Sequence, residues 1–562
     1  MKTKTLLAGA ACACAIALAA APAAAQGAAD FRACDGFRAP GRNADGMNRR
    51  AQSLFINPVI LGAFNGRRVA STSMGARGVE VCDAALASPL LLPEHTLRRA
   101  SLTRARGIYR LEAGDAQAAL ADFASSDEIA GADQPLYRRS VGLGTQLLRA
   151  YALHQAGRKD EAIAAARAAA AARPANPEVG LAAARIILAA NGDWDGYIAA
   201  LRGISRYNPT AIQSLFGLAM VRGRFDEMLA LQPHIVFAVP ATRDGAPALS
   251  SALAENFVSQ LEIDGASAFA LAVLGRKDAA EAALAGLTRR IDAALTEPTL
   301  PPGVTDRSTI RRELRRYRQL EMRADTIRAR AGFWRKMTEL RLLADARPAE
   351  AATQAAATPL GPNRLSLAIY EAIAAAHPAS REAMAPRIAA ARASTDATLA
   401  SLATTNIALI GQLLPEAENA SRVSGYNGGS QGFLGTEGYM SREASALPGA
   451  RTIIFATDQG TAGTNWEMAL LRAAELAVAD GKSGLIVIDR RVLQRTLVTT
   501  QYGREIDRDH EGFVAELDAV FVDPAALPAG LQTAGWRVLN AQEVIADLAP
   551  VYRQARPANA RR

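Results

Sequence analysis

The chain has 562 residues and a formal net charge of +9, with 64 lysines and arginines against 55 aspartates and glutamates. This length is enough for roughly three domains. The four cysteines and five scattered histidines never reach the spacing of zinc ligands, which argues against a zinc protein. Alanine and arginine are abundant in the way that a GC-rich genome imposes. The positive charge is therefore weak evidence for nucleic acid, and we expect no nucleic-acid partner.

The first 25 residues have the pattern of a secretory signal peptide. Lys2 and Lys4 form a positive start, residues 6–21 are apolar, and small residues at 23–25 supply a cleavage site before Gln26. No later segment reaches the ~18 consecutive apolar residues of a membrane-spanning helix. We therefore expect a periplasmic protein that carries a net charge of +7 after cleavage and has no transmembrane span.

Cleavage leaves two cysteines, Cys34 and Cys82, in an N-terminal segment that covers residues 26–98. Two cysteines in an oxidising compartment generally pair, so we predict a Cys34–Cys82 disulfide; two buried free thiols are the alternative. Closing such a loop stabilises a fold by roughly 3–4 kcal/mol. Cys12 lies inside the signal peptide. Lipidation of Cys12 is disfavoured because Gly9 stands where lipoprotein signals have an aliphatic residue.

Residues 99–290 contain a repeated pattern of alanine-rich segments joined by a short loop of glycine and a polar or charged residue. The loop glycines are Gly114, Gly157, Gly192, Gly223 and Gly275. The clearest pair, Gly157 and Gly192, is separated by 35 residues. Small residues that let two helices approach closely are expected at Gly107, Ala119, Ala150 and Ala162. The period resembles the tetratricopeptide repeat of roughly 34 residues, which implies an α-solenoid of stacked helix pairs. An unrelated alanine-rich helical bundle is the alternative.

A solenoid of helix pairs exposes a concave groove that suits a peptide or protein segment. Its side chains come from the first helix of each pair. The candidate partner-binding residues are Arg106, Tyr109, Arg110, Arg149 and His154. For any one of them taken singly, an ordinary solvated side chain is the favoured interpretation.

Residues 291–420 are expected to continue as a basic and alanine-rich helical extension. Within it, residues 307–341 interleave arginines with apolar residues spaced by three or four, which predicts an amphipathic segment with a basic face. Such a face can rest on an anionic membrane surface. The segment lacks the bulky apolar stripe needed for insertion, so a solvated capping helix is the favoured interpretation.

The composition changes after residue 419 to glycine, aromatic and β-branched residues, and residues 421–555 are predicted to form a smaller α/β domain. The expected strands are residues 452–456, 485–488, 496–501, 519–522 and 537–539, and the expected helices are residues 465–479 and 542–549. The predicted fold class is therefore mostly α, a tetratricopeptide-like α-solenoid followed by this domain.

The helix and strand of this domain carry a family resemblance. The run NWEMALLRAAEL at residues 465–476 leads into GLIVIDR at residues 484–490, after SGY at residues 424–426 and before AQEVIADL at residues 541–548. This order resembles a family of small alphaproteobacterial envelope lipoproteins of unknown function. The resemblance implies an envelope location. It carries over no catalytic residue, and the chain lacks that family's lipid-bearing cysteine.

Residues 428–432 match the GxSxG pattern of a nucleophile elbow around Ser430. A nucleophile elbow needs an apolar strand before it and a helix after it, and neither flank has that character, so a flexible turn is favoured. Two carboxylates flanking a sugar would indicate a glycosidase. Only Glu437 and Glu443 lie near the glycine-rich residues 425–438, and nothing in the sequence places them opposite each other.

A second pattern near the C-terminus suggests calcium. Asp507, Asp509, Glu511 and Asp518 fall at the spacing of EF-hand ligands. The last ligand is a short aspartate and the flanks resemble strands, so the calcium site is a weak candidate and an acidic hairpin loop is favoured. Residues 460–464 could bind an anion with their backbone N–H groups, but an N-cap for the following helix is the favoured interpretation.

Together these observations favour a non-enzymatic periplasmic scaffold or adaptor, without a cofactor, that binds an envelope protein or peptide through a helical-repeat groove. The alternative is a peptidoglycan- or carbohydrate-associated binding protein or hydrolase that acts through the C-terminal domain. The sequence leaves open the identity of the partner and the oligomeric state.

Overall fold

The computed structural model describes residues 29–41, 46–47, 74–131, 135–235, 250–298, 307–358, 360–411, 413–415, 430–432, 435–443, 449–457, 461–501, 504–528 and 530–553. The predicted signal peptide lies outside these residues. The chain divides into two compact units. Unit 1 combines Met1–Asn208 with Thr404–Arg562, and unit 2 is Pro209–Ala403. Unit 2 therefore begins inside the range in which the sequence predicts repeats.

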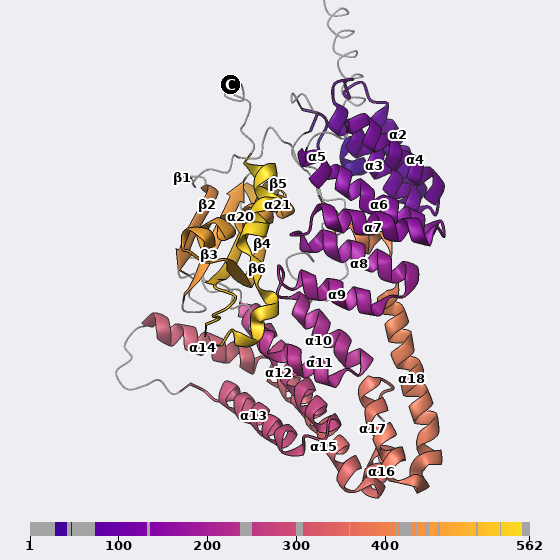
Figure 1. The fold of residues 1–562 in the computed structure, drawn as a ribbon, viewed down its shortest axis with the longest axis vertical. Helices are drawn as coiled ribbons and strands as arrows, with labels where there is room; N and C mark the ends of the chain where they lie inside the picture. The colour runs from indigo at the N-terminus through magenta and orange to yellow at the C-terminus, as the bar shows by residue number, and fades with distance from the viewer. Residues whose placement is uncertain are drawn as a thin grey trace, which may run out of the picture. The chain divides into compact units, whose positions relative to one another are not determined.

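The N-terminal part of unit 1 is a series of helices that pack on their neighbours in the chain (Figure 1). The helices are α2 Gly75–Leu86, α3 Thr96–Glu112, α4 Ala116–Ala130, α5 Pro135–Arg139, α6 Val141–Gln155, α7 Lys159–Ala172, α8 Pro177–Asn191 and α9 Trp194–Ile204. A short helix from the return of the chain, α19 Ile407–Gly411, packs on α3 and α6. The sequence predicted this mostly helical character.

The predicted loop glycines end helices in both units. All five have positive φ, from 70° at Gly192 to 83° at Gly114, a conformation that glycine adopts without steric cost. Asp115 and Asp193 follow two of them and cap the next helix, where their carboxylates accept from the backbone N–H groups of residues 118 and 196. Each loop therefore stops one helix and starts the next within a few residues.

Small residues also allow the helices of a pair to approach closely. Gly107 of α3 faces Phe123 of α4, and a Cβ atom at residue 107 would lie 2.5 Å from the Phe123 ring. Ala119, Ala150 and Ala162 are fully buried. These four positions are the ones at which the sequence pattern predicts a close helix–helix contact.

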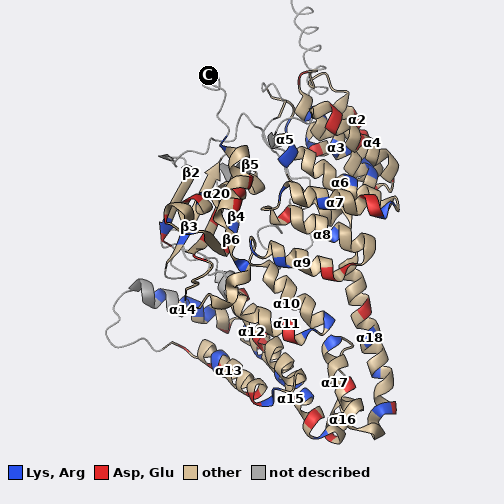
Figure 2. Cartoon of the chain, in the orientation of Figure 1, with Lys and Arg blue, Asp and Glu red and all other residues tan. Residues whose placement is uncertain are grey.

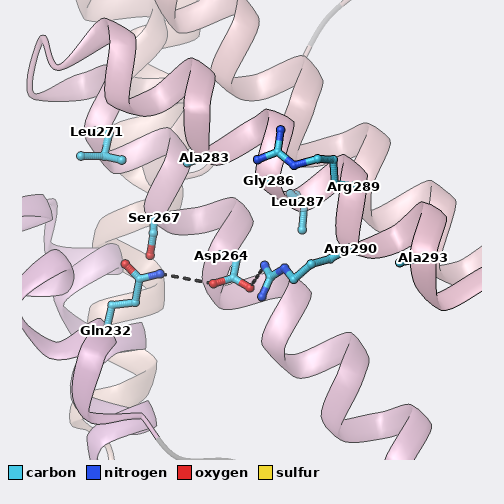
Figure 3. A pocket seen from close by; sticks show the side chains of 10 residues that line it. All are labelled: Gln232, Asp264, Ser267, Leu271, Ala283, Gly286, Leu287, Arg289, Arg290 and Ala293. Carbon is cyan, nitrogen blue, oxygen red and sulfur yellow. Dashed lines mark hydrogen bonds and ion pairs between the residues drawn. The ribbon is translucent and has the colours of Figure 1, made fainter. Parts of the chain in front are cut away.

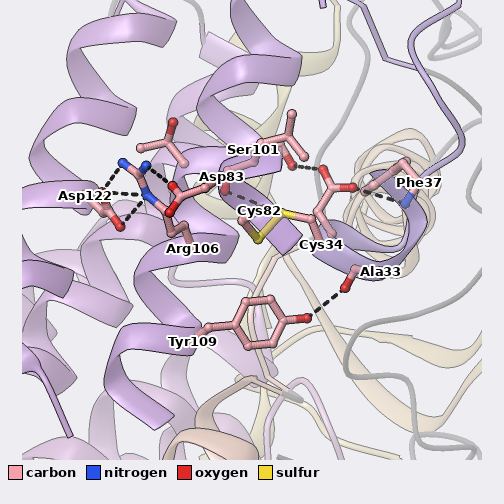
Figure 4. The surroundings of a disulfide bond; sticks show 12 residues. Ala33, Cys34, Phe37, Cys82, Asp83, Ser101, Arg106, Tyr109 and Asp122 are labelled. Carbon is pink, nitrogen blue, oxygen red and sulfur yellow. Dashed lines mark hydrogen bonds and ion pairs between the residues drawn. A yellow bond between two sulfur atoms is a disulfide. The ribbon is translucent and has the colours of Figure 1, made fainter. Parts of the chain in front are cut away.

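Cys34 and Cys82 lie at disulfide-bonding distance, with 2.11 Å between the sulfur atoms (Figure 4). This pair joins residues 29–41 to α2, as the sequence predicted. A buried ion pair lies beside it, in which the Arg98 guanidinium is 2.7 Å from a carboxylate oxygen of Asp35. The Ser101 hydroxyl donates to the same Asp35 oxygen at 3.0 Å. The N-terminal segment is thus attached to α2 and α3 by covalent, ionic and apolar contacts.

Unit 2 is helical throughout its described residues. Its helices are α10 Ala211–Arg222, α11 Phe225–Leu231, η2 Gln232–His234, α12 Ser250–Val273, α13 Lys277–Leu295, α14 Arg307–Glu321, α15 Ala324–Ala346, α16 Pro348–Ala357, α17 Arg364–Ala376, η4 Pro378–Ser380 and α18 Arg381–Ala403. The basic segment predicted over residues 307–341 forms two helices, α14 and α15, with a break at residues 322–323. Among the described residues, no helix has both the length and the apolar content to cross a membrane.

The C-terminal part of unit 1 is a six-stranded antiparallel sheet in the order β1-β2-β3-β5-β4-β6. The strands are β1 Ser430–Gly432, β2 Gly435–Glu443, β3 Ala450–Thr457, β4 Gly484–Gln501, β5 Arg504–Val522 and β6 Leu539–Asn540, and the helical segments are α20 Ala462–Ala479, η5 Gln532–Arg537 and α21 Ala541–Tyr552. Both predicted helices are present, and the predicted strand 452–456 lies in β3. The sequence did not predict β1 and β2, and the predicted strand 537–539 covers only the end of η5 and the start of the two-residue β6. The predicted strands 485–488 and 496–501 are one long strand, β4, which pairs with β5.

The core of this domain lies between the sheet and α20. Phe455, Val487 and Leu517 point from three neighbouring strands toward Trp466 and Leu470 on the helix, and all five are buried. Alternation along each strand sends the intervening side chains to the other face, where η5 and its flanking loops cover part of it. This packing fixes the position of the N-terminal half of α20, which carries the buried Glu467.

Candidate functional site

A cavity of about 530 Å³ opens in unit 2 between α12 and α13 (Figure 3). The residues that line it are Gln232, Asp264, Ser267, Leu271, Ala283, Gly286, Leu287, Arg289, Arg290 and Ala293. The two helices are joined by the loop at Gly275, so the repeat-like turn sets the spacing of the cavity walls. One wall is mostly apolar, and the polar groups gather around Asp264.

Asp264 is the centre of the polar side of the cavity. One of its carboxylate oxygens accepts a hydrogen bond from Gln232 at 3.3 Å, and the Gln260 amide donates to both oxygens at 3.1 Å. Arg290 from α13 forms an ion pair with it (Figure 3). Asp264 is thereby neutralised and held in place.

Arg289 supplies the remaining charge at the cavity. Its guanidinium lies over Gly286, 3.8 Å from where a Cβ atom would stand. It forms no ion pair with any residue in the described part of the chain. The Ser267 hydroxyl donates to the carbonyl of Ile263 on its own helix at 2.8 Å, so its proton is engaged in the helix. The arrangement suits the binding of a ligand with apolar and hydrogen-bonding groups.

The predicted partner-binding arginines of α3 and α6 are engaged in ion pairs inside unit 1. Arg106 lies between Asp122 and Asp83, at 2.7 and 2.6 Å (Figure 4). Arg110 reaches the same Asp122 at 3.1 Å, whereas Arg149 pairs with Asp127 at 2.7 Å. The structure thus brings Arg106 and Arg110 together on Asp122, and Asp83 supplies the second negative charge.

The other two predicted residues differ in exposure. Tyr109 is buried: its ring packs on Gly78 of α2, and its hydroxyl donates to the Ala33 carbonyl at 3.1 Å. Burial raises the pKa of this hydroxyl. His154 is half-buried, and burial together with Lys159 lowers its pKa. The segment that carries Cys34 therefore covers the part of α3 in which the sequence predicted a groove side chain.

The calcium candidate lies in an extended strand. Asp507, Asp509, Glu511 and Asp518 are all in β5. The strand register pairs Asp507 and Asp509 with β4, and Asp518 with both β4 and β3. An EF-hand loop must curve around its ion, which an extended strand does not do. Asp518 instead accepts from the Thr452 hydroxyl at 2.5 Å and from Arg491 at 3.3 Å. Among the described residues, no group of three acidic, histidine or cysteine side chains could hold a metal ion.

The backbone also shows where the other candidate catalytic and anion-binding residues lie. Ser430 starts β1, which forms a hairpin with β2, so it is not on a turn that leads into a helix. Glu437 and Glu443 are six residues apart on β2, about 20 Å along a strand, which is farther than the carboxylates of a glycosidase stand. Thr461 is the N-cap of α20, with its hydroxyl accepting from the Thr464 N–H at 3.2 Å, as the favoured interpretation of residues 460–464 proposed.

A buried network that no sequence pattern indicated surrounds Glu467 of α20. This side chain is fully buried, and Arg173 at the end of α7 donates to it at 2.6 Å. Arg139 of α5 lies 3.2 Å away, and the Tyr552 hydroxyl of α21 donates at 2.6 Å. Burial alone would raise the pKa of Glu467, but Arg173 and Arg139 outweigh it, so the pKa is lowered. We call these four residues the Glu467 network.

The neighbours of Glu467 attach α20 to the same helices. The Trp466 indole N–H donates to the carbonyl of Ala175 at 2.9 Å, and the Arg490 guanidinium stacks 4.7 Å from the Trp466 ring centre. Arg490 also pairs with Glu178 of α8 at 2.8 Å. The C-terminal sheet and the N-terminal helices therefore share a polar interface within unit 1. The one sequence feature that could have indicated this network is a glutamate on an otherwise apolar face of the predicted helix.

No protein-family model, curated protein or solved structure matches this chain.

Proposed function

We propose that the protein is a non-enzymatic scaffold or adaptor of the periplasm that binds an envelope protein or peptide in the cavity between α12 and α13. The cavity itself is the observation that carries the proposal, because it combines an apolar wall with a fixed carboxylate and a guanidinium without a described ion-pair partner. An extended segment offers both the apolar side chains and the backbone groups that such a surface can bind.

The repeat pattern supports the same function. A tetratricopeptide-like α-solenoid is a scaffold whose grooves hold peptide segments, and the loop glycines of residues 99–290 have the geometry that such loops need. The periplasmic location rests on the predicted signal peptide and on the envelope resemblance of residues 422–550. The cavity, between two consecutive helices of the pattern, is where we place the groove.

Filling the cavity tests this proposal. Gly286 lies on α13 with room for a side chain, so G286L places a butyl group in the cavity without a backbone clash. Peptides are first selected on the mature chain, residues 26–562, from a phage-displayed random library. We expect G286L to lose binding of these peptides by tenfold or more, an effect of about 1.4 kcal/mol, because it occupies their volume.

G332L is the matched control, because Gly332 is exposed on α15 with nothing near its Cβ position. Both changes replace a helical glycine and should raise the free energy of unfolding by roughly 0.5–1 kcal/mol. Peptides that bind wild type, G286L and G332L alike would refute binding in this cavity. Failure to select any peptide with micromolar affinity would refute the scaffold function proposed for it.

A further inference from the structure

Helix α14 carries a row of basic side chains on one face. Arg311, Arg315 and Arg318 are spaced by four and three residues, and Met322 follows after four more. The backbone N–H of Met322 donates to the Arg318 carbonyl at 3.0 Å, so the helical turn continues to it. At 3.6 residues per turn this spacing aligns the four side chains on one side of the helix. We call these four residues the arginine stripe.

The opposite side of α14 faces the rest of unit 2. Leu314 and Tyr317 are half-buried, Leu320 is buried, and the helix packs on α12 and α13. The arginine stripe, in contrast, is exposed along its length. Met322 is 79% exposed, the most exposed large apolar side chain in the described part of the chain. Lysine and arginine residues are blue in Figure 2, which shows blue segments along α14.

The charges of the stripe are not balanced within the described residues. None of Arg311, Arg315 and Arg318 forms an ion pair with a described side chain, and neither does Arg316 on the flank. Two arginines that follow α14 in the chain do form ion pairs. Arg323 pairs with Glu255 at 3.2 Å, and Arg330 pairs with Glu262 at 3.3 Å. Acidic residues of α12 thus balance Arg323 and Arg330, whereas Arg311, Arg315 and Arg318 have no ion-pair partner among the described side chains.

We propose that the arginine stripe is a docking surface for anionic phospholipid headgroups, with Met322 entering the edge of the apolar layer. A guanidinium forms paired hydrogen bonds with phosphate, and arginines on a helix face match a plane of such groups. An exposed methionine in line with three arginines is the reason for choosing a lipid surface over a soluble acidic polymer. A polymer offers charge but no apolar layer for that side chain.

Vesicle binding of the mature chain tests this surface. Vesicles of phosphatidylglycerol mixed with phosphatidylcholine are compared with vesicles of phosphatidylcholine alone, at low and high salt, by sedimentation. Each basic side chain near an anionic membrane increases partitioning about fivefold. We therefore expect binding to the anionic vesicles only, lost at high salt, and reduced about 100-fold in R311Q/R315Q/R318Q.

The control R276Q/R347Q/R381Q removes three exposed arginines from elsewhere in unit 2 and should reduce binding by less than threefold, or about 0.6 kcal/mol. M322S should weaken binding about tenfold at low salt, because it removes the apolar contact while leaving the charge. Circular dichroism checks that each variant is folded. Equal binding of the two triple variants, no binding of wild type, or full displacement by soluble alginate with no effect of M322S would each overturn the proposal.

Discussion

The Glu467 network and the α12–α13 cavity both bring arginines to a carboxylate, in opposite environments. Glu467 is fully buried with Arg173 and Arg139 beside it, whose side chains are only 1% and 9% exposed. At the cavity, Asp264 is 14% exposed and its partner Arg290 is 49% exposed. The arginine–carboxylate pair is therefore buried in the Glu467 network and exposed to solvent at the cavity.

This difference in exposure suits the two ion pairs to different roles, one structural and the other in ligand binding. Removing charges from water is costly, so a buried pair persists only while every partner is present, and the loss of one leaves an uncompensated charge. A pair at a solvent-filled cavity can exchange partners with water or a ligand at little cost. The Glu467 network is thus suited to hold the C-terminal sheet on the N-terminal helices. The cavity is suited to receive something from outside.

The largest effect is expected from E467A, which leaves Arg139 and Arg173 buried without their carboxylate. We expect the free energy of unfolding of unit 1 to fall by about 3–5 kcal/mol, measured by urea denaturation. The control is E161A, because Glu161 pairs with Arg158 on the exposed surface of α7, and its unfolding midpoint should match that of wild type. Equal midpoints for E467A and E161A would remove the distinction between the two regions.

The pH dependence checks the charge of Glu467. Its pKa is lower in the folded protein than the value of about 4.3 expected when unfolded, so its stabilising contribution is complete above that pH. The contribution is lost as the pH falls through the folded pKa. The difference in stability between wild type and E467Q should therefore shrink between about pH 5 and pH 3. A constant difference over this range would show that Glu467 is buried in its protonated form.

The disulfide is a covalent counterpart of the same kind of attachment. C34S/C82S should lower the free energy of unfolding of unit 1 by roughly 3–4 kcal/mol, because the unfolded chain regains the freedom of the loop between the two residues. The measurement is again urea denaturation, with and without a reducing agent. Wild type should become like the double variant when reduced, and the variant should not respond. A variant as stable as oxidised wild type would show that the ion pair of Asp35 and Arg98 holds the segment without the bond.

Features set by neighbouring residues were predictable from the sequence. A glycine with positive φ ends one helix, and the side chain of the aspartate after it caps the next. The loops at Gly114 and Gly192 illustrate this. The disulfide-distance pair followed from counting the cysteines outside the predicted signal peptide. The helix α20 and the strand before it were also predicted, because their apolar patterns are strong.

Features set by distant residues were not predictable. Glu467 meets Arg173 and Arg139 across 294 and 328 residues of sequence, so no local pattern relates them. Tyr109 has the spacing of a groove residue, yet the segment around Ala33 covers it. The long β4–β5 hairpin was divided into shorter strands, because its polar and charged residues resemble loops in sequence and only the pairing of the two distant backbone segments makes them strands.

The smallest effect is expected at the cavity, and it completes the comparison. D264N removes the ion pair with Arg290 but keeps a side-chain oxygen that can accept from Gln232. Because Arg290 is half exposed, water can solvate its guanidinium once the carboxylate is gone. We therefore expect the free energy of unfolding of unit 2 to change by about 0.5 kcal/mol. Urea denaturation of D264N beside E467A measures both under the same conditions. A loss in D264N as large as that in E467A would mean that the cavity pair holds α12 and α13 together, and the cavity would then be a structural joint with no freedom to receive a ligand.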